Sequence, residues 1–192
     1  FTQPDSIGKV VVLDMGVKLN ILRNFAIREL EIVVVPYNYT YEQIMEYKPN
    51  GVFISNGPGD PAIYKSAIEV CRNLIENNIP TFGICLGNQI LGLAAGGTSF
   101  KLPYGHRGTN KTVINTKTNQ CYITSQNHGF CVKDFEKGGF KEFLKNIDDG
   151  SNEGLTHESK PVFAVQFHPE ACPGPLDSLY LFDRFMEIME LK

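Results

Sequence analysis

The sequence has no strong excess of charge of one sign and no dense block of lysine and arginine. Its 18 Lys and Arg residues nearly balance 21 Asp and Glu residues, which gives a net charge of -3. Nothing in this balance indicates a nucleic-acid partner. The longest apolar runs, such as residues 9–13 and 32–35, have the length of a strand, whereas a membrane-spanning helix needs about 20 apolar residues. No signal peptide is visible. We therefore expect neither a nucleic-acid-binding nor a membrane-spanning protein.

The sequence also has no C-x-x-C pair, and its five cysteines are an odd number. A disulfide framework or a metal site is therefore not expected, and a reducing, cytoplasmic compartment fits best. A mitochondrial location stays open because the N-terminus is missing. Four cysteines are expected to be small buried or half-buried residues, namely Cys71, Cys121, Cys131 and Cys172. Cys85 is the exception because of the residues around it.

The length of 192 residues, with 42% hydrophobic and 20% charged residues, is typical of one globular domain. The chain starts with Phe1 and runs almost at once into an apolar segment. We expect residues 1–8 to be a lead-in from a longer chain and residues 9–192 to form one domain.

Strand and helix signals alternate in the first half of the chain. Apolar, valine-rich runs predict strands, and apolar residues at helical spacing predict helices. The predicted strands are residues 9–13, 31–37, 51–55 and 80–84, and the predicted helices are residues 18–30, 41–47, 62–77 and 86–95. This alternation indicates a parallel sheet with helices on both faces.

The pattern changes after Gly96 and Gly97. Residues 112–115, 120–125 and 129–132 have the character of short antiparallel strands, residues 161–167 of another strand, and residues 178–191 of a closing helix. The expected fold class is α/β, with a mostly parallel sheet, helices on both faces and a short antiparallel extension.

Cys85 lies between two glycines in the segment Gly83-Ile84-Cys85-Leu86-Gly87. This is the spacing of a nucleophile elbow, a sharp strand-to-helix turn that exposes one side chain and needs small neighbours. A cysteine reacts as its thiolate, and the start of a helix favours that charge. The segment predicts a nucleophilic cysteine.

His168 and Glu170 follow the last predicted strand and are separated by one residue. In an extended segment their side chains point the same way, so the carboxylate can hold one ring nitrogen and leave the other for the sulfur. The other histidines, His106, His128 and His157, have no carboxylate two residues away in an apolar strand. A Cys85/His168/Glu170 triad is therefore the leading hypothesis.

Acyl transfer also needs donors for the developing oxyanion. The N–H of Leu86 is one candidate, and the loop from Gly57 to Gly59 can offer another because glycine allows close approach of the backbone. The same loop, at the end of a predicted strand, also fits an ordinary turn. It lacks the G-K-[ST] ending of a phosphate loop.

These motifs resemble the class I (triad) glutamine amidotransferases. The resemblance rests on the elbow with Gln89, on the strings Q-N-H-G-F at residues 126–130 and F-H-P-E at residues 167–170, and on their order. The strings S-N-G-P-G-D-P at residues 55–61 and E-A-C-P-G-P-L-D at residues 170–177 narrow it to the glutaminase domain of carbamoyl phosphate synthetase.

The resemblance implies that Cys85 attacks the side-chain amide of L-glutamine and forms a γ-glutamyl thioester, with His168 as proton carrier and Glu170 as its orienting group. It implies a substrate cradle made by Gly57, Gly59, Leu86, Gln89, Asn127, Gly129 and Phe130. The ammonia would pass to a carbamoyl phosphate synthetase large subunit or domain. ATP and magnesium would be used there, with no metal or cofactor in this domain.

Two departures stand out. Position 88 is asparagine where the family motif commonly has histidine. Because the triad does not use this position, we expect the activity to be modified and not lost. The family also has a separate N-terminal domain that supplies a serine to the glutamine site, and this chain begins after it. The present piece is then expected to bind glutamine weakly.

Three alternatives remain open from the sequence: another amidotransferase of the same fold, a cysteine peptidase or γ-glutamyl hydrolase, and a docking or regulatory domain without activity. The retained triad argues against the last. The pathway, pyrimidine or arginine biosynthesis, is not fixed by the residues, nor is fusion to the synthetase.

Overall fold

The computed structural model describes residues 5–191, and its strands in that range form one nine-stranded sheet. The strand order is β2-β1-β3-β4-β9-β8-β7-β5-β6. The first five run parallel: β2 (Leu30–Pro36), β1 (Gly8–Asp14), β3 (Gly51–Ile54), β4 (Thr81–Ile84) and β9 (Val162–Val165). The lead-in expected over residues 1–8 falls partly outside the described residues.

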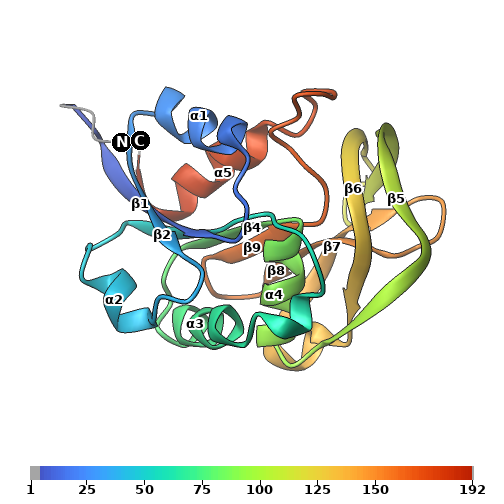
Figure 1. Cartoon of the computed structure of the whole chain (residues 1–192). Coiled ribbons are helices and arrows are strands. Elements are labelled where there is room, and N and C mark those ends of the chain that lie inside the picture. The colour runs from blue at the N-terminus through green and yellow to red at the C-terminus, as the bar shows by residue number, and fades with distance from the viewer. Residues whose placement is uncertain (1–4, 192) are drawn as a thin grey trace.

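Each face of the parallel strands packs against its own layer of helices. In β1, Val11 and Leu13 face one core cluster, and Val10 and Val12 face the other. This two-sided burial explains why the strand is an unbroken apolar run. On one face lie α2 (Tyr41–Met45), α3 (Lys65–Glu76) and α4 (Leu86–Ala94); on the other lie α1 (Leu19–Ile27) and α5 (Tyr180–Ile188) (Figure 1). The α/β class with helices on both faces is confirmed.

The antiparallel part is larger than the short extension expected from the sequence. It contains β8 (Asn152–His157), β7 (Phe140–Asn146), β5 (Thr98–Asn115) and β6 (Cys121–Lys133). The long β5–β6 hairpin stands at the side of the sheet (Figure 1). Pro103, Gly105 and Gly108 interrupt the apolar alternation of β5, and the ladder shifts register near them. Because of these breaks, the sequence pattern predicts only short strands where the structure has one long strand.

Smaller expectations also need correction. The helix expected over residues 62–77 begins only at Lys65, because residues 61–63 form the 3-10 turn η1 (Pro61–Ile63), and Ile63 is 69% exposed. A second turn of this kind, η2 (Phe135–Gly138), precedes β7. Cys71 and Cys131 are buried as expected, whereas Cys121 and Cys172 are exposed. Within residues 5–191, no helix is both long and apolar enough to cross a membrane.

Candidate active site

Cys85 occupies the turn between β4 and α4, as the elbow hypothesis predicts. Its backbone has φ 55° and ψ -101°, a left-handed φ that side-chain-bearing residues rarely adopt. The Cys85 N–H donates to the Val165 carbonyl at 2.8 Å, and its own carbonyl accepts from the Asn88 N–H at 3.1 Å. Bonds to β9 and to the first turn of α4 therefore hold this unusual conformation in place.

The two glycines of the elbow are required by packing. A Cβ atom on Gly87 would lie 2.2 Å from the Ile54 carbonyl oxygen of β3, and one on Gly83 would lie 2.8 Å from the Gly87 carbonyl carbon. Both distances are too short for a side chain. The start of α4 therefore passes directly against the sheet, which fixes the position of the sulfur.

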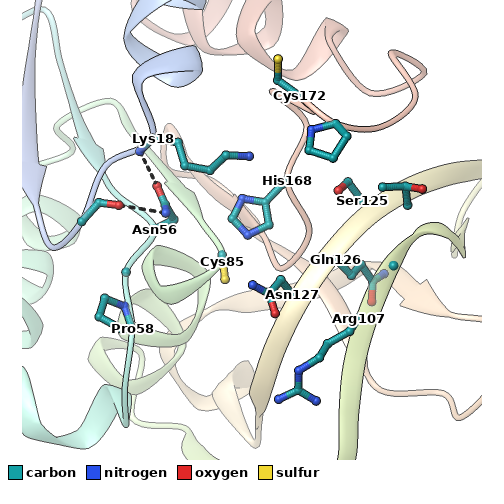
Figure 2. A pocket seen from close by; sticks show the side chains of 15 residues that line it. Lys18, Asn56, Pro58, Cys85, Arg107, Ser125, Gln126, Asn127, His168 and Cys172 are labelled. Atoms are coloured by element: carbon teal, nitrogen blue, oxygen red, sulfur yellow. Dashed lines mark hydrogen bonds between the residues drawn. The ribbon is translucent and has the colours of Figure 1, made fainter.

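His168 lies beside Cys85 on the wall of a cavity (Figure 2). Its Nδ1 is 2.7 Å from Glu170 Oε1, which leaves Nε2 available to the sulfur. Burial disfavours the charged imidazole, but the interactions with Cys85 and Glu170 prevail and raise the pKa of His168 to about 10. The arrangement places a readily protonated imidazole beside the sulfur of a cysteine, a residue that reacts as its thiolate.

Lys18 is a site residue that the sequence analysis missed. Its Nζ lies 2.9 Å from Glu170 Oε1 and donates to the Ala171 carbonyl at 2.9 Å. Burial raises the pKa of the Glu170 carboxyl, but His168 and Lys18 outweigh this effect and lower it overall. Lys18 stands between the carboxyl end of β1 and the start of α1, a place where ligands bind in parallel sheets. This position, just after a predicted parallel strand, was the feature of the sequence that could have identified Lys18 as a site residue.

The cavity has a volume of about 630 Å³ and adjoins a smaller pocket of about 100 Å³. Both are lined by Gly57, Pro58, Cys85 and Asn127. Six of the seven residues expected to cradle the substrate line the smaller pocket: Gly57, Gly59, Gln89, Asn127, Gly129 and Phe130. The seventh, Leu86, has a buried side chain at the start of α4, so only its backbone N–H could serve the pocket.

The loop after β3 lies close to the elbow, as its glycines suggested. A Cβ atom on Gly57 would lie 2.3 Å from the Met15 carbonyl oxygen and 2.8 Å from Leu86 Cδ2. Only glycine fits there, and its absent side chain lets this backbone pack against Met15 and Leu86, the residue after Cys85. The spacing is compatible with an oxyanion pocket built from Leu86 and this loop.

Gln89 and its neighbour Asn88 brace the far wall of the pocket. Gln89 Nε2 donates to the Phe130 carbonyl at 2.8 Å and to Gln166 Oε1 at 3.2 Å. Asn88 is fully buried and donates to Gln166 Oε1 and Asn152 Oδ1, each at 3.3 Å. Asn88, which replaces the histidine common in the family motif, therefore lies in the interior among side chains that support Gln89. It lines neither cavity.

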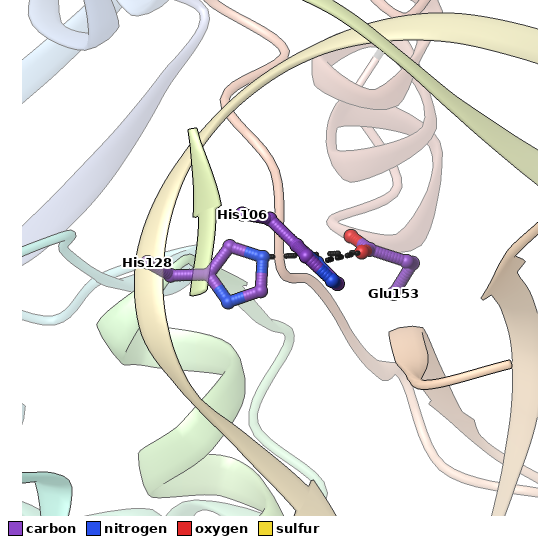
Figure 3. A group of neighbouring side chains, drawn as sticks. All are labelled: His106, His128 and Glu153. Atoms are coloured by element: carbon purple, nitrogen blue, oxygen red, sulfur yellow. Dashed lines mark ion pairs between the residues drawn. The ribbon is translucent and has the colours of Figure 1, made fainter. Parts of the chain in front are cut away.

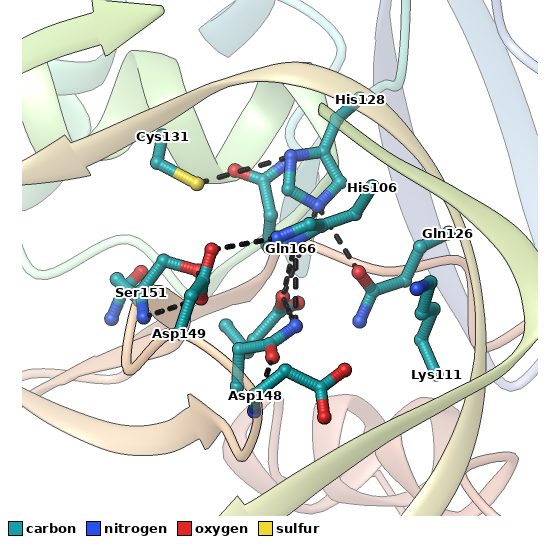
Figure 4. Close-up of polar contacts among 12 residues, drawn as sticks. His106, Lys111, Gln126, His128, Cys131, Asp148, Asp149, Ser151 and Gln166 are labelled. Atoms are coloured by element: carbon teal, nitrogen blue, oxygen red, sulfur yellow. Dashed lines mark hydrogen bonds and ion pairs between the residues drawn. The ribbon is translucent and has the colours of Figure 1, made fainter. Parts of the chain in front are cut away.

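Behind this wall lies one group of side chains within residues 5–191 that could hold a metal ion: His106, His128 and Glu153 (Figure 3). His106 Nε2 is 2.9 Å from Asp149 Oδ2, and its Nδ1 is 3.3 Å from Glu153 Oε1. The contact with Glu153 raises the pKa of His106. The two ring nitrogens of His106 thus face two carboxylates, and Figure 4 shows its ring beside Asp149.

His128 belongs both to this cluster and to the lining of the small pocket. Its Nδ1 lies 3.0 Å from the Phe130 carbonyl. Burial lowers the pKa of His128 to about 4, so the ring is neutral at pH 7. Its other ring nitrogen, Nε2, lies 3.3 Å from Gln126 Oε1 and 3.9 Å from Glu153 Oε1. Unlike the triad histidine, His128 braces the segment from Asn127 to Phe130.

Comparison with known proteins agrees with this geometry. The family described as Glutamine amidotransferase class-I matches residues 11–188. The carbamoyl phosphate synthase small chain of Methanocaldococcus jannaschii is 49% identical over 186 residues, which cover 96% of this chain and 52% of that protein. The arginine-specific small chain of Neurospora crassa is 47% identical over 192 residues, covering 99% and 42%. The chain spans about half the length of these relatives.

Solved structures show the same fold. A protein from Thermoplasma acidophilum that is assigned to GMP synthase superposes with a TM-score of 0.79 at 21% identity, covering 95% of this chain and 94% of that one. A glutamine amidotransferase from Thermotoga maritima gives a TM-score of 0.70 at 15% identity, covering 95% and 82%. The matched family, the relatives and the elbow with its adjoining histidine and glutamate lead to one conclusion: this chain belongs to the class I glutamine amidotransferases.

Proposed function

We propose that this chain is the glutaminase part of a carbamoyl phosphate synthase, releasing ammonia from L-glutamine for a synthetase partner. The observation that supports this proposal most directly is the contact of His168 with both Glu170 and Cys85 at the wall of a cavity. The use of the ammonia for carbamoyl phosphate synthesis is inferred from the relatives, which are carbamoyl phosphate synthase small chains.

In the proposed reaction, the thiolate of Cys85 attacks the side-chain carbonyl carbon of glutamine. The imidazolium of His168 gives its proton to the leaving nitrogen, the C–N bond breaks, and ammonia departs from a γ-glutamyl thioester. His168 then takes a proton from water, the resulting hydroxide attacks the thioester, and glutamate leaves as the sulfur regains its charge. Glu170 and Lys18 keep the ring oriented throughout.

The backbone N–H of Leu86 and the Gly57–Gly59 loop are proposed to bind the oxyanion, and the small pocket is proposed to hold the rest of the glutamine. ATP and magnesium belong to the partner in this proposal. A cysteine peptidase is less well supported, because the family model that matches residues 11–188 is that of the class I glutamine amidotransferases.

The test is ammonia and glutamate release from glutamine by the full-length protein, followed by glutamine-dependent carbamoyl phosphate synthesis with the partner present. Stoichiometric glutamate and carbamoyl phosphate would support the proposal. Glutamine hydrolysis without any gain in carbamoyl phosphate would point to another amidotransferase, and hydrolysis of γ-glutamyl peptides in preference to glutamine would contradict it.

A further inference from the structure

The buried cluster of His106, His128 and Glu153 has no part in the chemistry proposed above (Figure 3). Its members come from three different strands, β5, β6 and β8. Their ligating atoms all lie within 4.8 Å of one another. Glu153 is fully buried, and its Oε2 has no hydrogen-bond partner among residues 5–191. A buried carboxylate with an open oxygen needs a positive partner.

The ring nitrogens of both histidines face oxygen atoms. His106 Nδ1 is 3.3 Å from Glu153 Oε1, and its Nε2 is 2.9 Å from Asp149 Oδ2. His128 Nε2 is 3.3 Å from Gln126 Oε1 and 3.9 Å from Glu153 Oε1. The two rings thus direct one nitrogen each at the same carboxylate oxygen, as the dashed lines in Figure 3 show.

A neutral imidazole has only one N–H to donate. Because His128 Nδ1 already faces the Phe130 carbonyl at 3.0 Å, a neutral ring leaves its Nε2 as a lone pair among oxygens. The Gln126 amide keeps its oxygen turned to this ring, since its Nε2 donates to Thr124 Oγ1 at 3.1 Å. Protonating both histidines would put two positive charges in rings whose centroids are 4.9 Å apart, and like charges repel. One metal ion satisfies both rings and the carboxylate together.

The donor set fits zinc. Two imidazoles and one glutamate, with a fourth position open, are an established zinc combination. Tetrahedral ligands at about 2.0–2.1 Å from zinc lie roughly 3.3–3.4 Å apart, close to the 3.3 and 3.9 Å between Glu153 Oε1 and the two rings.

Each of the three ligands also has an outer partner that orients it. The other ring nitrogen of His106 faces the Asp149 carboxylate, and that of His128 faces a backbone carbonyl. Glu153 Oε1 accepts a hydrogen bond from Asn146 Nδ2 at 3.0 Å. Partners of these kinds are typical of the histidines and carboxylates that bind metal ions.

We propose that His106, His128 and Glu153 bind one Zn²⁺ ion, with Gln126 Oε1 or a water molecule as the fourth ligand. The ion ties the β5–β6 hairpin to β8 and acts on stability, with no part in proton transfer. The expectation of a metal-free domain rested on cysteine spacing and on the family resemblance, and neither bears on ligands contributed by three strands. This inference does not depend on the proposed glutaminase function.

The test is zinc binding by the full-length protein carrying Cys85→Ser, which removes the thiol of the elbow as a competing ligand. The protein is stripped with a chelator, dialysed and titrated with Zn²⁺ alone by calorimetry. Glu153→Gln should abolish the binding of one ion per chain or raise its Kd at least about 100-fold, because loss of an outer partner alone costs about 10–100-fold. Asp149→Asn removes such an outer partner and should raise the Kd by about 10–100-fold.

Two controls show where the ion binds. Glu158→Gln removes an exposed carboxylate of the same region, paired with Lys141, and should leave the Kd unchanged. Co²⁺ in place of Zn²⁺ should give the visible absorption of a tetrahedral ion without the near-ultraviolet band of a thiolate ligand. A thiolate band would place the ion on an exposed cysteine, Cys121 or Cys172, and would refute the site.

Stability provides an independent readout. Saturating Zn²⁺ should raise the Tm of the Cys85→Ser protein, because an ion that binds only the folded state stabilises it, and this rise should be absent when Glu153→Gln is added. A protein that binds no zinc, or a Kd that Glu153→Gln leaves unchanged, would refute the site while leaving the glutaminase proposal intact. Should Glu153→Gln fail to fold, His106→Gln provides the same comparison.

Discussion

The ammonium of Lys18 lies 2.9 Å from Glu170 Oε1, the same oxygen that lies 2.7 Å from His168 Nδ1. One carboxylate oxygen therefore serves two cations. Lys18 comes from the end of the first parallel strand and Glu170 from the segment after the last. The bond joins the segments that follow the first and the last parallel strands of the chain, at the point where the proton carrier is held.

Replacing Lys18 by methionine should loosen that arrangement without removing the triad. We expect kcat/KM to fall by up to roughly 10²-fold, the cost of a small misplacement of a reacting group. Without the ammonium, the pKa of Glu170 rises, so the acidic limb of the pH–rate profile should move to higher pH. Lys9→Met, which removes a lysine paired with Glu31 on the sheet surface, is the matched control. A Lys18→Met protein with an unchanged acidic limb would show that Lys18 does not act through Glu170.

Replacing Cys85 by serine should abolish glutamine hydrolysis and leave the fold intact. A hydroxyl is far less acidic than a thiol, and a site arranged for a thiolate cannot ionise it. Ammonia release measures the loss, and thermal unfolding checks the fold. Turnover comparable with that of the unmodified protein would remove Cys85 from the role of nucleophile.

Glu170→Gln should slow turnover less than His168→Asn does. The amide can still position the ring, whereas loss of His168 removes a proton carrier that contributes roughly 10²–10⁴-fold. Steady-state measurements of kcat for the two variants show which change is the more damaging. A lower kcat for Glu170→Gln than for His168→Asn would contradict the roles assigned to these two residues.

The pH dependence gives a further check on Glu170. Because the raised pKa of His168 keeps its proton until about pH 10, activity should persist on the alkaline side and fall as the pH passes that value. Removing the Glu170 charge lowers this pKa, so the alkaline limb of Glu170→Gln should move to lower pH. A limb that stays in place would mean that Glu170 does not stabilise the charged ring.

Gly87→Ala should destabilise the protein. The new methyl group would lie 2.2 Å from the Ile54 carbonyl oxygen, and overpacking of this kind costs about 1–3 kcal/mol. Urea denaturation measures the free energy of unfolding. Gly129→Ala is the control for stability, since its only neighbour within 4 Å is Arg107 Nη2 at 4.0 Å. Equal stability of both variants would contradict the close packing of α4 on β3.

The first half of the fold could be predicted because its signals are local. Valine-rich runs and helical spacing predict β1 to α4 within a few residues, and the elbow and the His168–Glu170 pair are short motifs. The antiparallel strands β7 and β8 were missed because their apolar residues are few and their pairing lies between distant segments. Lys18 was missed for a related reason: nothing within a few residues marks it, and its partner, Glu170, lies far along the chain.

The register of the β5–β6 hairpin determines which side chains the substrate meets. Arg107 pairs with Asn127 and His106 with His128, and neighbouring residues on a strand face opposite sides. A slip of β6 by one residue would turn the Asn127 side chain away from the cavity that it now lines with Arg107. Residues 116–120, which join the two strands, line neither cavity. The pairing of the two strands, at a distance from this turn, thus decides which side chains form the wall of the cavity.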